Sequence, residues 1–236
     1  DRAVDGRLFL ADRANHRIRL RNAAGTTLST YAGSGTAGFL DGTTTSARFN
    51  YPHDVAWHGP SATLYVADRN NHRIRRIAGG KVTTLAGSGS ASLLNGKGIA
   101  ARFYYPEGIA VAPSGVVYVG DTSNHAIRRI TSAGVVTTLA GTNTAGFING
   151  SGAAARFSSP RGLVVLGDGS VLVADSSNHR LRRVTTAGVV SVFAGSGTAG
   201  FLNGGLTSAR FNYPYDVAVA PGGTIVVADS SNYRVR

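Results

Sequence analysis

The 236-residue sequence lacks several residue types on which whole classes of protein depend. It has no cysteine, which excludes a disulfide framework and a thiolate metal site. No stretch approaches the roughly 18 consecutive apolar residues that a membrane-spanning helix needs, so no membrane span is expected. Methionine is also absent and the chain begins at Asp1, so we expect a segment of a longer protein, in which a removed signal peptide would be invisible.

Negative charge is scarce as well. The chain has 12 acidic against 24 basic residues, a formal net charge of +12 and an isoelectric point near 10.8. That balance is typical of proteins that bind nucleic acid or anionic surfaces. Lys81 and Lys97 are the only lysines, so nearly all of the positive charge is carried by arginine. The positions of the arginines therefore decide whether the charge forms a binding surface or a structural element.

The abundant features are glycine, with 32 residues, and internal repetition. The pair Arg-Phe begins at positions 48, 102, 156 and 210, always 54 residues apart, and Ala-Gly at 32, 86, 140 and 194 keeps the same step. Within one repeat, short segments rich in Val, Ile and Thr are bounded by Gly, Pro, Ser and Asn, which is typical of strands. The expected strands of one repeat are 108–112, 116–121, 124–130 and 135–141, followed by a long loop.

A single four-stranded sheet cannot bury both of its faces, so successive repeats must pack against one another. Radial packing of such sheets gives a β-propeller. We therefore predict an all-β fold, a β-propeller of four-stranded antiparallel blades, over residues 1–236. The segment Asp1–Val4 aligns with the first strand of later repeats, which gives four complete blades and a fifth that lacks its last strand after NYRVR.

The repeat resembles those of the NHL-repeat propellers, through YVAD-x2-NHRIRRI at 65–77 and the strand VVTTLAG at 135–141. The resemblance covers essentially the whole chain and implies the propeller fold. Family repeats usually run about 40 to 45 residues, and the surplus here lies in the long loop AGSGTAGFLDGTTTSARFNYP at 32–52. Because propellers of this family usually have six blades, we expect the five repeats to belong to a larger ring in a longer protein.

Side chains that recur once per repeat are expected to be structural. The histidines of the NHRIRR segment, replaced by Tyr233 in the last copy, should bridge neighbouring loops by hydrogen bonds. The recurring aspartates should pair with arginines of the third strand. Most arginines occupy such repeated positions, which spreads the charge evenly instead of concentrating it in one nucleic-acid footprint. The repeated positions are His16, His72, His125 and His179, and Asp12, Asp68, Asp121, Asp175 and Asp229.

A partner is expected to meet positions whose residues differ between repeats. The residue after each loop proline is such a position, and its neighbours also vary. Tyrosine and arginine are preferred anchors at interfaces, and loops on a rigid scaffold commonly carry the binding residues. The candidate partner-binding residues are His53, Glu107, Arg161 and Tyr215, with Asp54, Asp216, Tyr51, Tyr105 and Tyr213 beside them. The alternative is that these are solvated rim residues which vary freely.

Function is therefore expected to be binding without catalysis, by an arginine-rich repeat protein with no catalytic residue, metal or cofactor. A protein partner is the first expectation and a glycan the second, in an extracellular or cell-surface setting. Two alternatives stay open, both implied by the resemblance. One is single-stranded RNA binding on a basic face. The other is a metal-dependent lyase or lactonase, for which His53, Asp54, Glu107 and Asp216 are the nearest ligands.

Overall fold

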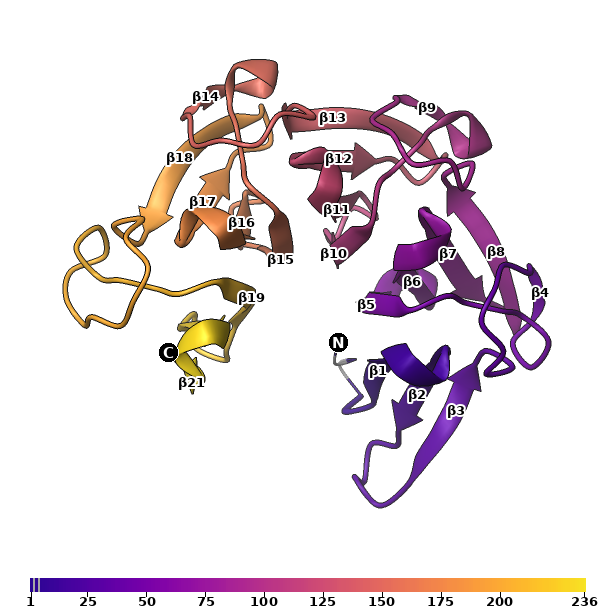
Figure 1. Ribbon diagram of the computed structural model, residues 1–236. Helices are drawn as coiled ribbons and strands as arrows, with labels where there is room; N and C mark the ends of the chain where they lie inside the picture. The colour runs from indigo at the N-terminus through magenta and orange to yellow at the C-terminus, as the bar shows by residue number, and fades with distance from the viewer. Residues whose placement is uncertain (2, 4) are drawn as a thin grey trace. The chain divides into compact units, whose positions relative to one another are not determined.

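The computed structural model describes residue 1, residue 3 and residues 5–236, and its strands form five antiparallel sheets in chain order (Figure 1). The first sheet has the order β1-β2-β3, with β1 (Leu8–Asp12), β2 (Arg17–Arg21) and β3 (Leu28–Ala32). The second has the order β4-β8-β7-β6-β5, with β4 (Gly42–Thr43), β5 (Pro52–His58), β6 (Thr63–Asp68), β7 (Arg73–Ala78) and β8 (Lys81–Ala86). One sheet per repeat confirms the predicted all-β propeller class.

The later sheets repeat this pattern. The third has the order β10-β11-β12-β13-β9, with β9 (Gly96–Lys97), β10 (Pro106–Val111), β11 (Val117–Asp121), β12 (Ala126–Ile130) and β13 (Val135–Gly141). The fourth has the order β14-β18-β17-β16-β15, with β14 (Gly150–Ser151), β15 (Pro160–Val165), β16 (Val171–Asp175), β17 (Arg180–Val184) and β18 (Val189–Ala194). The fifth has the order β19-β20-β21, with β19 (Pro214–Val219), β20 (Ile225–Asp229) and β21 (Arg234–Val235).

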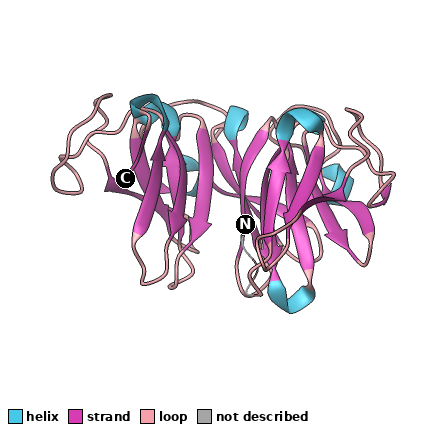
Figure 2. Ribbon diagram, turned by 90° about the horizontal axis from the view of Figure 1, so that it is seen from below, coloured by secondary structure: helices cyan, strands magenta, loops and turns pink. Residues whose placement is uncertain are grey.

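Short 3-10 turns connect many of these strands, and Figure 2 shows them at the strand ends. They are η1 (Arg13–Asn15), η2 (Gly59–Ser61), η3 (Arg69–Asn71), η4 (Gly98–Ala100), η5 (Thr122–Asn124), η6 (Gly152–Ala154), η7 (Ser176–Asn178) and η8 (Ser230–Asn232). The chain divides into two compact units, residues 1–117 with 130–136 and residues 118–129 with 137–236. Each unit is described by itself below.

The expected strand at 1–4 includes residues 2 and 4, which lie outside the described residues. Its described members pair as a strand would. The Phe9 N–H donates to the Asp1 carbonyl at 2.8 Å, and the Ala3 N–H donates to the Arg7 carbonyl at 2.8 Å. The Gly6 N–H closes the turn onto the Ala3 carbonyl with a φ of 87°, which glycine adopts without strain.

Each complete sheet contains one strand more than the predicted four. The long loop before a sheet adds a two-residue strand to that sheet's outermost strand: β4 pairs with β8, β9 with β13 and β14 with β18. This strand was not predicted, because two residues such as Gly42-Thr43 carry no alternating pattern. The added strand covers part of an edge that would otherwise expose unpaired backbone groups.

The Arg-Phe pairs place one residue in the core and the other outside it. Phe49, Phe103 and Phe157 are fully buried, and Phe211 is nearly so. In the first unit Phe49 packs in one cluster with Phe9, Leu64 and Ile77. The long loops are therefore held to the sheets by a large aromatic side chain in every repeat.

A buried ion pair recurs at the third strand, as predicted. Asp68 and Arg75 are both fully buried, and Arg75 Nη1 donates to Asp68 Oδ2 at 2.7 Å. Arg75 also donates to the carbonyls of Arg48 and Leu40, two residues of the preceding long loop. The arginine thus ties the loop to the sheet. The same pairing joins Asp121 to Arg128, Asp175 to Arg182 and Asp229 to Arg236, and a longer contact of 3.7 Å joins Asp12 to Arg19.

Candidate functional site

The recurring histidines link successive repeats by one hydrogen bond each. Each lies in the left-handed conformation directly after a 3-10 turn, with a φ between 51° and 55°. Its Nδ1 accepts a hydrogen bond from a backbone N–H of the next long loop, at 3.0 to 3.1 Å. The donors are Tyr51 to His16, Tyr105 to His72, Ser159 to His125 and Tyr213 to His179. The predicted structural role of these histidines is confirmed.

The geometry also fixes the protonation state of these imidazoles. A nitrogen that accepts from a backbone N–H must be unprotonated. Burial lowers the pKa of His72, His125 and His179, and for His72 the nearby Arg69 and Arg73 lower it further. His72, His125 and His179 are therefore neutral links, and all four histidines lie at the sheet ends where η1, η3, η5 and η7 follow a strand. We call this end of the sheets the turn face.

In the first unit, the turn face gathers three of the predicted site residues around an arginine that the sequence analysis missed. Arg69 Nε donates to Glu107 Oε1 at 2.8 Å, and its guanidinium carbon lies 4.3 Å from the centre of the Tyr105 ring. His53 Nε2 is 3.6 Å from Glu107 Oε2. Glu107 is only 2% exposed, so it supports Arg69 from below and offers little surface of its own.

Arg69 could have been found by the criterion that selected the other candidates. Its repeat position is occupied by Thr122 and Ser176 in the following copies. There the hydroxyl donates to the carbonyl of the next loop proline, Pro160 at 2.8 Å and Pro214 at 2.6 Å. Arg69 makes the corresponding connection, but to the side chain that follows the proline. The same inter-repeat link thus has a charged form in one repeat and neutral forms in two others.

Aromatic rings cover the turn face beside this cluster. The Tyr104 ring lies 5.0 Å from the Tyr105 ring and 5.7 Å from the His72 ring, measured between centroids. Tyr51 and Tyr104 are each 38% exposed. The Tyr51 ring makes an edge contact with His16 at 5.5 Å. The exposed edge of this surface is therefore tyrosine, with Arg69 partly exposed beside it.

The second unit places the remaining candidates in two pairs. The Arg161 guanidinium carbon lies 4.7 Å from the centre of the Tyr215 ring, a cation–π geometry. Tyr213 is 45% exposed and makes an edge contact with His179 at 5.1 Å. Both pairs present an aromatic ring and a nitrogen-bearing side chain together, as in the first unit.

The two aspartates have structural partners. Asp54 Oδ2 accepts from the Ile109 N–H of the next repeat at 3.0 Å, and Oδ1 accepts from the Val55 N–H at 2.8 Å. Asp216 Oδ1 accepts from the Val217 N–H at 2.8 Å, and a Cβ at Gly162 would lie 2.0 Å from that same oxygen. The glycine at position 162 therefore has a packing reason, because a side chain there would meet Asp216.

The described residues offer neither a metal-binding cluster nor a membrane-spanning helix. Within the part of the chain that the structure describes, no three His, Cys, Asp or Glu side chains gather closely enough to hold a metal ion. None of its helices, over those same residues, is long and apolar enough to cross a membrane.

Successive antiparallel sheets, with an Asp–Arg pair at the third strand and histidine links between successive repeats, define the class of this protein as a β-propeller. The NHL repeat matches residues 49–77, 103–130, 157–183 and 211–236. The chain belongs to the NHL repeat family. The stretches between the matches contain the outermost strands and the long loops, which are the parts that exceed the usual repeat length.

Two relatives illustrate how the chain compares in length. "Protein SUPPRESSOR OF QUENCHING 1, chloroplastic" of Arabidopsis thaliana is 29% identical over 247 residues, which cover 97% of this chain and 23% of that protein. "NHL repeat-containing protein 2" of Bos taurus is 38% identical over 95 residues, covering 39% of this chain and 13% of that protein. The chain thus spans less than a quarter of the length of either relative.

Solved structures share the fold at low sequence identity. An auxiliary nutrient binding protein from Bacteroides thetaiotaomicron aligns with a TM-score of 0.67 and 20% identity, over 98% of this chain and 65% of that chain. A chain of a Nidogen/Laminin complex aligns with a TM-score of 0.67 and 18% identity, over 98% of this chain and 71% of that chain. Virginiamycin B lyase from Staphylococcus aureus aligns with a TM-score of 0.62 and 16% identity, over 100% of this chain and 64% of that chain.

Proposed function

We propose that this chain is a non-enzymatic interaction module that binds a protein partner through its turn face, in an extracellular or cell-surface setting. The observation that carries the proposal is the cluster of Arg69, Tyr104 and Tyr105 around His72. Tyrosine and arginine are the side chains most often found at the energetic centres of protein interfaces. Here they are held by their neighbours, so little side-chain freedom is lost on binding.

Relatives with the same fold support a binding role. One structural neighbour is a chain of a Nidogen/Laminin complex, and another is an auxiliary nutrient binding protein. Because these likenesses are at 20% identity or below, they support the class of function and leave the partner open. The scarcity of lysine and the richness in glycine support the proposed setting outside the cell.

The structure divides the predicted contact residues into exposed and supporting ones. Tyr51 and Tyr213 are exposed and can contact a partner directly. Glu107 is buried and ion-paired, so its replacement by alanine is expected to destabilise the fold as well. The contact surface that we propose is therefore tyrosine and arginine, with His53 and Glu107 beneath it.

The test uses replacements that the chain itself contains at the same repeat positions. Tyr51→Ser and Tyr213→Ser copy Ser159, and Tyr104→Asn copies Asn50. Because those residues already occupy equivalent backbone conformations, the triple variant should melt at nearly the wild-type temperature. Peptides selected on the wild-type protein from a phage-displayed random library should lose at least about tenfold in affinity for it, the loss expected at interface centres.

The matched control is Leu28→Thr, an exposed apolar residue at the end of β3 away from the turn face. Its peptide affinities should equal those of the wild type. Selected peptides that bind both variants as tightly as the wild type would refute a turn-face interface. Binding of arrayed glycans instead of peptides, lost in the same triple variant, would replace the protein partner by a carbohydrate.

A further inference from the structure

An arginine at the start of the third strand lies in a fixed cradle in several repeats. The guanidinium carbon of Arg73 lies 3.7 Å from the centre of the Phe39 ring, and that of Arg180 lies 3.9 Å from the centre of the Phe147 ring. Each also donates from Nη2 to the carbonyl of a loop serine, Ser88 or Ser196. The ring and the serine segment thus both contact the guanidinium.

Glycine lines the serine side of the cradle, in a backbone conformation that favours it. Gly89 and Gly197 follow those serines with φ of 96° and 86°. A Cβ at Gly89 would lie 2.5 Å from Arg73 Nη1, and one at Gly197 would lie 2.1 Å from Arg180 Cζ. The Gly-Ser-Gly segments are therefore walls that the guanidinium fits against.

One repeat lacks all three parts of the cradle at once. Where the other repeats have arginine, the third has Ala126, and where they have the wall glycine it has Asn143. The position of the phenylalanine is occupied by Leu93. The three residue types change together, which indicates that arginine, glycine and phenylalanine form one functional unit and that the fold tolerates its absence.

In the part of the chain that the structure describes, the cradled arginines have no ion-pair partner of their own, although Asp68 and Asp41 attract Arg73 and Asp175 attracts Arg180 over a longer distance. Among the described residues, no acidic oxygen lies within ion-pair distance of Arg73, Arg180 or Arg234, whereas the arginine two positions later is paired with a buried aspartate in each case. Both arginines share one ring: Arg75 lies 4.9 Å from the Phe39 centroid. Burial and the neighbouring Arg75 lower the pKa of Arg73. An anion would therefore be attracted to these partly desolvated cations.

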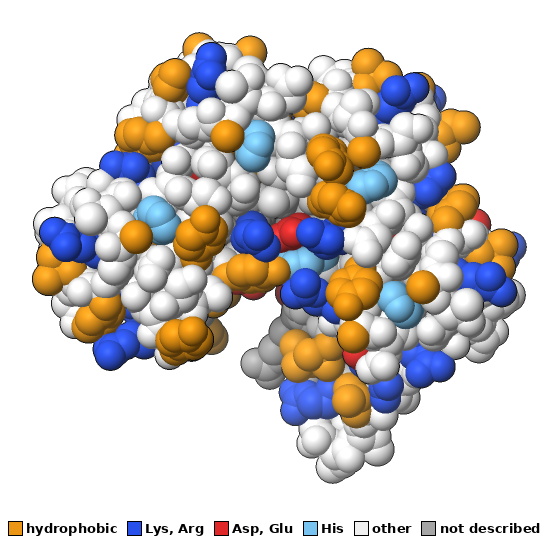
Figure 3. All heavy atoms as spheres, in the orientation of Figure 1, with side chains coloured by type: hydrophobic (Ala, Val, Ile, Leu, Met, Phe, Trp, Pro, Cys, Tyr) orange, Lys and Arg blue, Asp and Glu red, His pale blue; other side chains and the backbone are white. Residues whose placement is uncertain are grey.

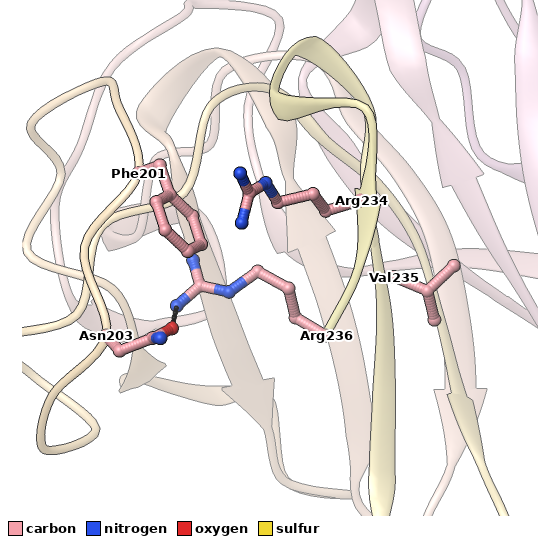
Figure 4. A pocket seen from close by; sticks show the side chains of 5 residues that line it. All are labelled: Phe201, Asn203, Arg234, Val235 and Arg236. Carbon is pink, nitrogen blue, oxygen red and sulfur yellow. Dashed lines mark hydrogen bonds between the residues drawn. The ribbon is translucent and has the colours of Figure 1, made fainter.

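The pairing of arginine and ring recurs in the last repeat, where Arg234 lies over the Phe201 ring at 3.9 Å (Figure 4). Arg236 beside it is held by Asn203 and by Asp229. On the face seen in Figure 3, basic side chains lie next to hydrophobic ones and acidic atoms are few.

We infer that the cradled arginines bind the carboxylates of an acidic protein segment, which makes the partner of the turn face an acidic one. This inference rests on the proposed function and narrows it. Arg73 directly follows His72 in the sequence, so its cradle lies next to the cluster of Arg69 and Tyr105. A guanidinium whose orientation is fixed by a ring and a carbonyl retains N–H groups for a carboxylate and loses little entropy on binding it.

The test transplants the third repeat's residues into the fourth. The variant carries Arg180→Ala, Gly197→Asn and Phe147→Leu, all in one unit, and should fold because the chain already uses this combination. The probe is a fluorescein-labelled octaglutamate peptide, followed by anisotropy in low salt. Its affinity should fall about tenfold, as for the loss of one charge-assisted hydrogen bond. Phe147→Leu alone keeps the charge, removes the ring and should give part of that loss.

The control is Arg156→Ala, which removes the same charge from a long loop outside the cradle and should change the affinity by less than about twofold, as a screened surface charge does. Equal losses in both variants, or no binding of octaglutamate, would overturn the inference. An octauridylate probe that binds more tightly and is weakened by the same transplant would assign the cradles to RNA. Turn-face peptides selected without acidic residues would leave the proposed function standing and refute only this inference.

Discussion

The buried pair of Asp175 and Arg182 offers the sharpest test of how the blades are held together. Both side chains are fully buried, and Arg182 Nη1 lies 2.9 Å from Asp175 Oδ2. Arg182 also donates to the carbonyls of Arg156 and Ile148 and to Asn149 Oδ1. The perturbation is Arg182→Met, which keeps much of the buried volume and removes the charge and every one of these hydrogen bonds.

The expected loss of unfolding free energy follows from the hydrogen bonds that Asp175 keeps in the variant. Asp175 keeps two donors, the Ser158 N–H and Asn178 Nδ2, each at 2.8 Å. Its charge would then be buried without a counter-charge, and breaking a buried pair in this way costs about 3–5 kcal/mol. The double variant Arg182→Met with Asp175→Asn removes both charges, so it should recover most of that cost.

Urea unfolding at equilibrium measures the change in the free energy of unfolding. Far-UV circular dichroism and tryptophan fluorescence are followed together, because coincident transitions show that the unfolding is two-state. The control is Arg183→Met, whose ion pair with Asp168 has both side chains more than 40% exposed and should cost less than about 1 kcal/mol. An Arg182→Met variant no less stable than this control would refute the role assigned to the buried pair.

The pH dependence gives an independent check on the same residues. Burial raises the pKa of Asp175 to about 6, with the Arg182 charge acting in the opposite direction. A raised folded-state pKa means that the stability contributed by the protonated carboxyl is present below its unfolded value near 3.8 and is lost as the pH rises through about 6. Without the Arg182 charge, the pKa of Asp175 in the variant must lie above that of the wild type, so the penalty of Arg182→Met should be smallest below pH 6 and grow as the pH rises above it. A penalty that is constant between pH 5 and 8 would contradict this.

Three further predictions concern single side chains. His72→Tyr, which copies Tyr233, should cost about 1 kcal/mol at pH 7, because the Tyr105 N–H loses its acceptor. The pKa of His72 is lower in the folded than in the unfolded state, so wild-type stability falls as the pH drops below 6.5. The difference in unfolding free energy between wild type and variant should therefore narrow by pH 5. Phe157→Ala should cost about 3–5 kcal/mol in urea unfolding, since the side chain is fully buried, and a cost below about 1 kcal/mol would show that the loop is not anchored there. Glu107→Ala should lower the melting temperature, because Glu107 is buried and ion-paired with Arg69. An unchanged melting temperature would show that Glu107 does not support the fold and could act only as a contact residue.

Repetition in the sequence determined the fold class and the role of the recurring side chains. The 54-residue step fixed one sheet per repeat, and the alternation of apolar residues fixed the strands, because both are properties of local chain segments. The structural role of His72 and the pairing of Asp68 could be predicted from recurrence, since a group needed once per blade must appear once per blade.

Only the tertiary structure decided which variable residues are exposed. The sequence placed Glu107 and Tyr51 in the same category, but one is buried under Arg69 and the other faces solvent. Exposure depends on how successive sheets meet, and that meeting brings together residues from different repeats, such as Arg69 and Glu107, 38 positions apart. The same holds for Gly89 and Gly197, because the arginine beside each lies 16 or 17 residues earlier in the sequence. Only the structure shows the two in contact.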